Sequence, residues 1–266
     1  MSLLSRLGSR INSRLLSIRR RWTDRFVSGL EVGQRIRIFD VVCPLRYDIL
    51  VRADFIAALA ENDKLLTIEL DELLEIRAAK SYAVWFREVC IKRFSPDIYH
   101  DENLVRQRFA IRVEKTKRLW ESISLNGFDL TQPISLRSGE AILALNGKKV
   151  GASIFAGDGC HRIACLLVMG KTYLEPNEYR VWMQSEFQPQ DNTALLIDKL
   201  PITEADYLTF ISRGYCEGRT LTTANDAVAY LKVHDPDRLT ELQYNLNSHL
   251  NLINTNGTTR KIQIRH

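Results

Sequence analysis

The chain lacks the features that mark membrane-spanning and zinc-binding proteins. It has no run of 18 or more apolar residues, whereas a helix that crosses a bilayer needs about 20. It has no Cys-x-x-Cys pair and no cluster of histidines, which argues against a structural zinc site. Internal repeats and low-complexity segments are also absent. These absences leave a globular protein whose function has to be sought in local motifs.

Cysteine is scarce and shows no pairing pattern. The five cysteines are an odd number without close spacing, and no secretory signal with a cleavage site precedes them: Cys43, Cys90, Cys160, Cys165 and Cys216. This favours a reducing cytoplasm over a disulfide framework. Cys90 and Cys165 fall on apolar helix faces, so we expect them in the core.

Positive charge is concentrated at one end of the chain. Residues 1–30 hold seven of the 37 Lys and Arg residues and one of the 32 Asp and Glu residues, which leaves 30 basic and 31 acidic residues elsewhere. A DNA-binding protein usually carries a basic face on its folded domain, so DNA is not an expected partner.

Residues 1–30 have the pattern of a basic amphipathic helix, because apolar residues recur at three- and four-residue steps. Such a helix fits the surface of an anionic membrane. Docking on its own domain, or on the partner of a homodimer, fits equally well, and a mitochondrial presequence has the same composition.

Beyond residue 30 the pattern alternates between strands and helices. It predicts strands over 35–42, 134–136, 142–145, 150–155 and 179–183, with a hairpin turn at Asn146-Gly147. It predicts helices over 51–62, 69–94, 103–126 and 163–169, and helical structure from 203 that ends in a polar tail.

The most informative motif is Gly157-Asp-Gly-Cys-His-Arg162, between a predicted apolar strand and an apolar helix. Glycine permits a sharp turn and close approach of a ligand, and the first amides of a helix attract anions. Arg162 could hold phosphate and His161 could donate a hydrogen bond or a proton. Asp158 could orient magnesium or a hydroxyl, although an aspartate here could simply cap the helix.

Residues 119–182 resemble the ParB/sulfiredoxin superfamily. The lead-in Leu119-Trp-Glu-Ser-Ile123, Gly127 and Gln132-Pro-Ile134 and the segment Asp158–Ala164 with Leu166, Leu167 and Gly170 carry the resemblance. It implies an α+β domain with a small mixed sheet. The expected organisation is an amphipathic arm (1–30), an N-terminal strand and helices (31–98), the ParB/sulfiredoxin-like core (99–185), and a C-terminal helical extension with a polar tail (186–266).

Asp158, Gly159, His161 and Arg162 reproduce the Asp-Gly-x-His-Arg turn of the free-serine kinases. The resemblance implies that Gly157, Gly159, Cys160, His161 and Arg162 bind the phosphates of ATP or ADP, with CTP as an alternative. Asp158 would bind Mg²⁺ or orient the acceptor. An upstream glutamate activates the acceptor hydroxyl in those kinases, and Glu102 or Asp101 stands where it is expected; helix capping explains that pair as well.

Two other branches of the superfamily leave alternatives open. Cys160-His161-Arg162 is similar to the sulfiredoxin motif, whose cysteine is the nucleophile; Asp158 stands where sulfiredoxins have glycine. Gly159 and Arg162 also fit the Gly-x-x-Arg of partition-type ParB proteins, which implies a non-catalytic, nucleotide-switched binding protein. A clear basic helix-turn-helix does not follow Arg180.

The function that these resemblances favour is a nucleotide-dependent kinase that phosphorylates a small hydroxyl-bearing acceptor, such as an amino acid or a sugar. We expect it in the cytoplasm, with the basic arm holding it at the inner face of the membrane, where a glycan acceptor in envelope polysaccharide assembly would be within reach.

Three further expectations concern single residues. The cluster Cys43-Pro-Leu-Arg-Tyr-Asp48 could shape an acceptor pocket, although packing and a turn explain it as well. Trp85, Trp120 and Trp182 are expected in the core. His234 and His249 lie in polar helical sequence and are expected at the surface.

Overall fold

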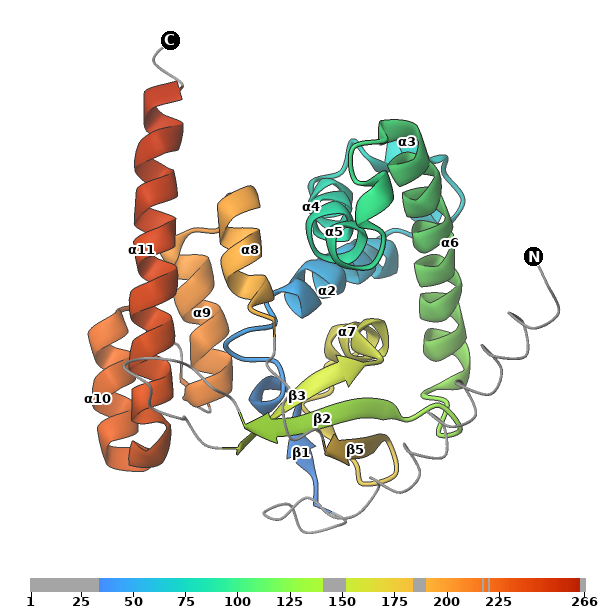
Figure 1. The fold of residues 1–266 in the computed structure, drawn as a ribbon. Coiled ribbons are helices and arrows are strands. Elements are labelled where there is room, and N and C mark those ends of the chain that lie inside the picture. Colours follow the sequence, from blue (N-terminus) through green and yellow to red (C-terminus); the bar gives the residue numbers. More distant parts are fainter. Residues whose placement is uncertain (1–33, 141–151, 184–189, 217, 220, 264–266) are drawn as a thin grey trace, which may run out of the picture.

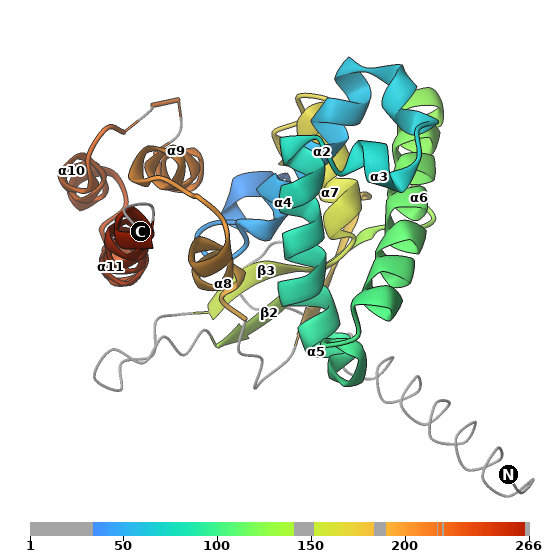
Figure 2. The same ribbon diagram turned by 90° about the horizontal axis from the view of Figure 1, so that it is seen from above.

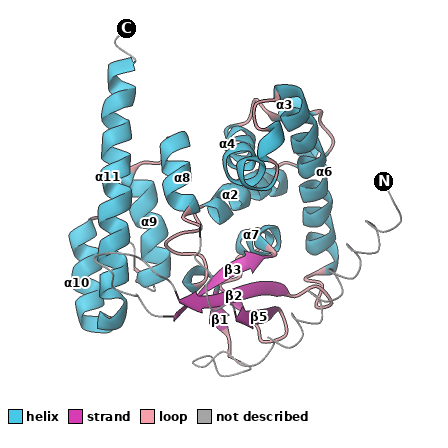
Figure 3. Cartoon of the chain, viewed as in Figure 1, coloured by secondary structure: helices cyan, strands magenta, loops and turns pink. Residues whose placement is uncertain are grey.

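The computed structural model describes residues 34–140, 152–183, 190–216, 218–219 and 221–263. The arm 1–30, the strand 142–145 and the hairpin turn Asn146-Gly147 lie outside these residues. The described chain is α+β and mostly helical, with a small mixed sheet (Figure 1). Figure 3 shows the helices arranged around and above that sheet. None of the described helices is long and apolar enough to cross a bilayer.

The three-stranded sheet has the order β3-β2-β5. Strand β2 (Ile134–Glu140) pairs antiparallel with β3 (Ala152–Asp158) and parallel with β5 (Tyr179–Met183). Strands predicted over 134–136, 150–155 and 179–183 are thus confirmed in position. Helix α7 (Cys160–Val168) follows β3 and packs on β2, as the apolar sequence after the turn predicts.

The strand predicted over 35–42 is wrong beyond its first residues. Only β1 (Ile36–Arg37) is a strand, paired with β4 (Tyr173–Leu174), and a 3₁₀ turn over Ile38–Asp40 follows. The apolar side chains from Ile38 to Val42 are all buried. Four apolar residues around the exposed Asp40 are therefore buried without a strand, and periodicity alone does not separate such a segment from a buried strand.

Helix α2 (Asp48–Glu61) lies between the two hydrophobic cores of the protein. Ile49 and Ile56 pack into the core formed with the sheet, α7 and the C-terminal helices, whereas Phe55 and Leu59 pack into a second core with α4 and α6. Because opposite faces of α2 are buried, the helix aligns residues at its N-terminus with elements on both sides.

The helix predicted over 69–94 is interrupted. It consists of α3 (Leu70–Leu73), α4 (Arg77–Trp85), a π-helix (Phe86–Ile91) and α5 (Lys92–Phe94). Leu73 and Tyr82 are buried in the same core, and the turn between them lets both reach it. The long helix α6 (Glu102–Asn126) agrees with the predicted 103–126 and ends at Gly127.

The C-terminal helices form a group on one side of the sheet (Figure 2). They are α8 (Asn192–Lys199), α9 (Glu204–Tyr215), α10 (Ala224–His234) and α11 (Leu239–Gln263). Capping boxes begin α9 at Thr203 and α10 at Thr223. Short 3₁₀ turns elsewhere span Asp63–Leu66, Pro96–Ile98 and Pro236–Arg238.

His249 is not at the surface as predicted. It is fully buried, with Nδ1 2.7 Å from Tyr207 Oη and Nε2 2.8 Å from Asp191 Oδ2. The polar sequence of α11 suggested a solvated face, but the imidazole finds polar partners on α9 and at the start of α8. His234 is exposed and Cys165 and Trp85 are buried, as expected, whereas Cys90, Trp120 and Trp182 are half-buried.

Candidate functional site

The turn singled out in the sequence joins β3 to α7. Gly159 precedes the helix with a φ of 81°, in the left-handed region that favours glycine. Its N–H donates to Asp158 Oδ1 at 2.6 Å, so the aspartate makes the local contact that its position suggests. The Asp158 side chain nevertheless remains exposed.

A cavity of about 380 Å³ lies beside this turn, within the usual size of small-molecule sites. Gly157, Asp158, Cys160 and His161 line it, so the corner where β3 meets α7 is open to a ligand. The rest of its lining comes from the start of α2, from α4, the π-helix and α5, from α6, from strands β2 and β3, and from the start of α8: Arg46, Arg52, Trp85, Val89, Cys90, Arg93, Phe94, Arg112, Arg137, Phe155, Ala156, Gln190 and Asn192.

Five arginines and one exposed carboxylate therefore face one cavity. The second carboxylate nearby, Asp48, is fully buried and lies 2.8 Å from Arg46 Nε and 2.7 Å from Arg52 Nη1. Burial alone would raise the pKa of Asp48, but the two guanidinium groups outweigh it and hold that pKa well below its usual range. After both carboxylates are counted, the cavity keeps a positive excess that suits an anion.

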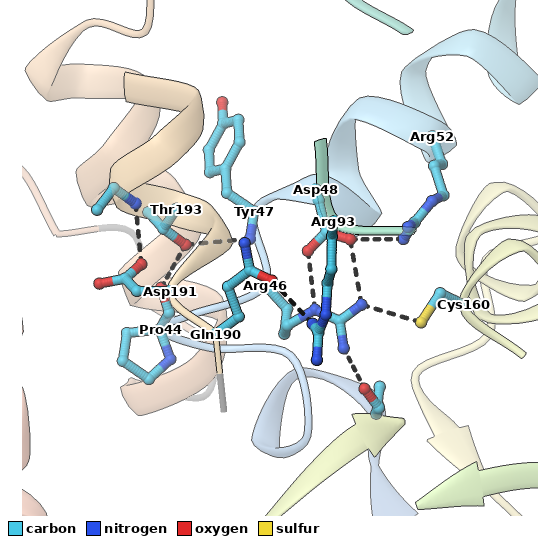
Figure 4. Close-up of polar contacts among 12 residues, drawn as sticks. Pro44, Arg46, Tyr47, Asp48, Arg52, Arg93, Cys160, Gln190, Asp191 and Thr193 are labelled. Carbon is cyan, nitrogen blue, oxygen red and sulfur yellow. Dashed lines mark hydrogen bonds and ion pairs between the residues drawn. The ribbon is translucent and has the colours of Figure 1, made fainter. Parts of the chain in front are cut away.

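Arg46 lines the cavity, and Figure 4 shows its polar contacts. Its guanidinium donates to both Asp48 carboxylate oxygens, to the carbonyl oxygen of Ala156, and to Cys160 Sγ at 3.0 Å. These contacts occupy four of the five N–H groups of an arginine. Arg46 thus ties α2 to the end of β3 and to the first residue of α7.

Arg52 is the second arginine that pairs with Asp48. Its guanidinium lies 4.1 Å from the centroid of the Trp85 ring, a cation–π distance. Its side chain is 7% exposed and forms an ion pair with Asp48. The Nε and Nη1 donors of Arg52 nevertheless have no hydrogen-bond partner in the described part of the chain.

Two more arginines come from neighbouring elements. Arg93, which is exposed, donates to Gln190 Oε1 at 2.8 Å and so joins α5 to the segment before α8. Arg137 from β2 lies against Gly157, where an added Cβ would be 2.7 Å from its Cγ. Glycine at this position therefore leaves room for the arginine at the cavity wall.

His161 lines the cavity, but its uncharged ring does not fit the proton donor that the sequence also suggested. Its ring packs against Tyr82 and Trp85, and Nε2 lies 2.7 Å from Tyr82 Oη. Burial, followed by the positive charges of Arg52 and Arg112, holds the pKa of His161 well below its usual value. The imidazole is therefore neutral at pH 7 and borders the cavity as an uncharged ring.

Arg162 also differs from its predicted role. It does not line the cavity. Its guanidinium folds back over Gly159, where an added Cβ would be 2.9 Å from Nη2. Gly159 is likewise outside the cavity lining. The residues that the turn contributes to the lining are therefore Gly157, Asp158, Cys160 and His161.

The predicted catalytic pair is not brought to the cavity. Asp101 caps α6 by accepting from the Leu104 N–H at 2.9 Å, and Glu102 pairs with Arg87 at 2.6 Å. Neither lines the cavity. Arg112, which does, lies ten residues along α6 from Glu102, or about 15 Å at the rise of a helix. The capping explanation of this pair is the one that the structure supports.

The functional residues that sequence reasoning missed are the arginines. Arg52, Arg93, Arg112 and Arg137 come from four separate elements, and no motif links them. Arg46 and Asp48 lie in the cluster that we expected to shape an acceptor pocket. The spacing of Asp48 and Arg52, one helical turn apart at the start of α2, was the available signal.

A larger cavity, about 550 Å³, lies on the other side of α2 and includes Tyr47, Asp54, Glu61 and Asp206. Its carboxylates outnumber its one arginine, Arg77. It is therefore poorly suited to phosphate, and the smaller arginine-lined cavity is the better candidate despite its size.

Comparison with known proteins gives no match: no family model, no curated protein and no solved structure is significantly similar to this chain. Among the described residues, no group of three or more His, Cys, Asp or Glu side chains could hold a metal ion. The site is thus defined by its own geometry, as a positively charged cavity at a strand-to-helix turn.

Proposed function

We propose that the protein binds the phosphates of a nucleotide in the arginine-lined cavity and transfers a phosphoryl group to a small hydroxyl-bearing acceptor. The observation that carries the proposal is the presence of five arginines around one cavity that also receives the strand-to-helix turn. Phosphoryl transfer depends mainly on positioning and on neutralising the charge of the transferred group, and guanidinium groups supply both.

In this proposal Asp158 binds Mg²⁺ or orients the acceptor, the role that the resemblance implies for it, and Glu102 and Asp101 have no part. Asp158 is the one carboxylate in the cavity lining among the described residues. Mg²⁺ in such sites is commonly held by one or two carboxylates together with the phosphates of the substrate, which Asp158 fits. Bound there, the ion would neutralise phosphate charge; Asp158 would otherwise orient the acceptor hydroxyl.

The proposal is tested by thermal unfolding of the full chain with ATP, ADP or CTP, each with and without Mg²⁺. We expect a nucleotide to raise the melting temperature, and a replacement of Arg137, which lies against Gly157 in the cavity lining, by Met to reduce that rise. Arg118→Met is the matched control, because Arg118 is exposed on α6 and does not line the cavity. If none of the three nucleotides stabilises the protein, the proposal is wrong.

A reductase of sulfiredoxin type is the second candidate. The observation in its favour is that Cys160 lines the cavity and contacts the guanidinium of Arg46. Cys160→Ser separates the two candidates: it should abolish a reductase and leave phosphoryl transfer within a few fold. Nucleotide binding without turnover, whatever acceptor is supplied, would instead indicate a nucleotide-switched binding protein.

A further inference from the structure

Four buried polar atoms on side chains that line the cavity have no hydrogen-bond partner among the described residues. They belong to three side chains that line one region of it: Arg52 Nε and Nη1, Trp85 Nε1, and Asn192 Oδ1. Arg52 Nη1 lies 2.7 Å from Asp48, so its charge is paired, but the geometry is not that of a hydrogen bond.

Such atoms are uncommon in native proteins and call for an explanation, because nearly all buried polar groups find a partner. Only two other side chains in the described chain, Arg162 and Asn245, have a buried polar atom in this condition. The concentration of four in one cavity wall indicates groups that are positioned to contact something other than the protein.

The unused atoms specify the chemistry of that ligand. Arg52 and Trp85 offer only donors, which an oxyanion accepts. The charge favours an anion too, because Arg46 and Arg52 share the single carboxylate of Asp48. Asn192 differs: its side chain helps to lower the pKa of Asp48 and so lies with its N–H group toward that carboxylate, which can only accept. The Nδ2 end of the Asn192 amide is therefore directed to Asp48, and Oδ1 is left as an acceptor for a donor on the ligand.

We propose that this wall is the acceptor subsite and that the acceptor is a small oxyanion with a hydroxyl group close to its charged group. The proposal rests on the function proposed above and adds the class of acceptor. Arg52 and Trp85 bind the anionic oxygens, and Asn192 Oδ1 accepts a hydrogen bond from the hydroxyl. The nucleotide phosphates lie nearer the turn at Gly157 and Asp158.

Matched pairs of probes test this directly by calorimetry on the full chain. Glycerol 3-phosphate is compared with n-propyl phosphate, and glycerate with propionate; each pair has the same anionic group, with and without hydroxyls. We expect the hydroxyl-bearing member of at least one pair to bind about tenfold more tightly, because the other leaves Asn192 Oδ1 unpartnered. Glycerol, which has no charge, should not bind measurably.

Variants assign the preference to residues. Asn192→Ala should bring the affinity ratio of the preferred pair close to one while leaving the affinity for its hydroxyl-free member nearly unchanged. Arg52→Met should weaken both members at least about tenfold. Should Arg52→Met fail to fold, Arg52→Lys keeps a charge beside Asp48 and loses the forked donors, and it should weaken both members too. Arg118→Met is the control and should change neither.

Each result bears on the proposal. Equal binding of both members in both pairs, or an unchanged ratio in Asn192→Ala, would overturn it. Competition between the probes and MgATP would show one shared subsite and also overturn it, although nucleotide binding would stand. If the probes discriminate but no nucleotide binds, the subsite stands and the proposed phosphoryl transfer fails.

Discussion

Arg46 Nη2 lies 3.0 Å from Cys160 Sγ, which joins the N-terminus of α2 to the first residue of α7 across 114 positions of the chain. The same guanidinium is paired with Asp48, and Asp48 is paired with Arg52. Arg46, Asp48 and Arg52 thus form a buried ionic cluster beside the cavity. Such a cluster has measurable consequences for stability and for its dependence on pH.

Replacing Asp48 by Asn should destabilise the protein strongly. Two guanidinium groups would lose the one carboxylate that they share, and breaking a buried ion pair in this way typically costs about 3–5 kcal/mol. Asp71→Asn is the control, because Asp71 is 81% exposed in its pair with Arg106 and an exposed pair contributes about 1 kcal/mol or less. Urea unfolding measures both. Losses of equal size would contradict the buried cluster.

The same carboxylate should make the protein sensitive to acid. The pKa of Asp48 is lowered in the folded state, so the unfolded chain takes up the proton first as the pH falls. The stability that Asp48 contributes is therefore complete above about pH 5 and declines as the pH falls through 4 and below. Asp48→Asn should lack this part of the decline. An unchanged acid limb in that variant would show that the ion pairs contribute nothing.

His161 should add a second pH dependence, nearer neutrality. Its pKa is lowered by burial and by Arg52 and Arg112, so below about pH 6.5 the unfolded chain binds a proton that the folded protein does not. Stability should fall as the pH drops from 7 to 5, by at most about 1.4 kcal/mol per pH unit for this group. His161→Gln should remove that slope. His234→Gln, at an exposed position, should leave it unchanged.

Gly159→Ala should lower stability and also alter ligand binding. Its φ of 81° costs an L-residue about 1–2 kcal/mol, and its new Cβ would meet Arg162 Nη2 at 2.9 Å. Gly170→Ala is a matched control, because its φ is 78° and nothing lies within 4 Å of the added atom. Thermal unfolding should show similar losses in both variants. Only Gly159→Ala should change nucleotide affinity, since it moves the start of α7.

Asp158→Asn and Glu102→Gln test which of these two carboxylates, both predicted to be catalytic, takes part in the reaction. Asp158 lines the cavity, whereas Glu102 is paired with Arg87 away from it. We expect Asp158→Asn to lower kcat about 100-fold or more, because Mg²⁺ or the acceptor hydroxyl loses its carboxylate, and to leave the affinity for nucleotide without Mg²⁺ nearly unchanged. Glu102→Gln should leave kcat within about twofold, since only an exposed ion pair is lost. The reverse pattern in steady-state kinetics would return the role to Glu102.

Much of the local structure could be predicted from the sequence. The glycines at 157 and 159, between an apolar strand and an apolar helix, were enough to place the turn, and the helical repeat before Gly127 was enough to place α6. The C-terminal helices followed from the same rule. The helix α8 and the interruption after Leu73 were not predicted, because each depends on which core its apolar residues join.

The roles within the turn could not be predicted from residue types alone. His161 and Arg162 had the right chemistry for phosphate, but the aromatic cluster of Tyr82 and Trp85 holds the imidazole neutral and Arg162 folds back over Gly159. Likewise His249, set in polar sequence, is buried between Tyr207 and Asp191. The direction of a side chain depends on neighbours that are remote in sequence.

The sequence by itself determined the turn, the helix that follows it and the carboxylate beside them, because backbone conformation at glycine and helix periodicity are local properties. Only the tertiary structure decided that arginines from α5, α6 and β2 join Arg46 and Arg52 around this turn. The reason is that charge in a cavity is set by which distant segments pack together, and that packing follows from the burial of α2 between two cores.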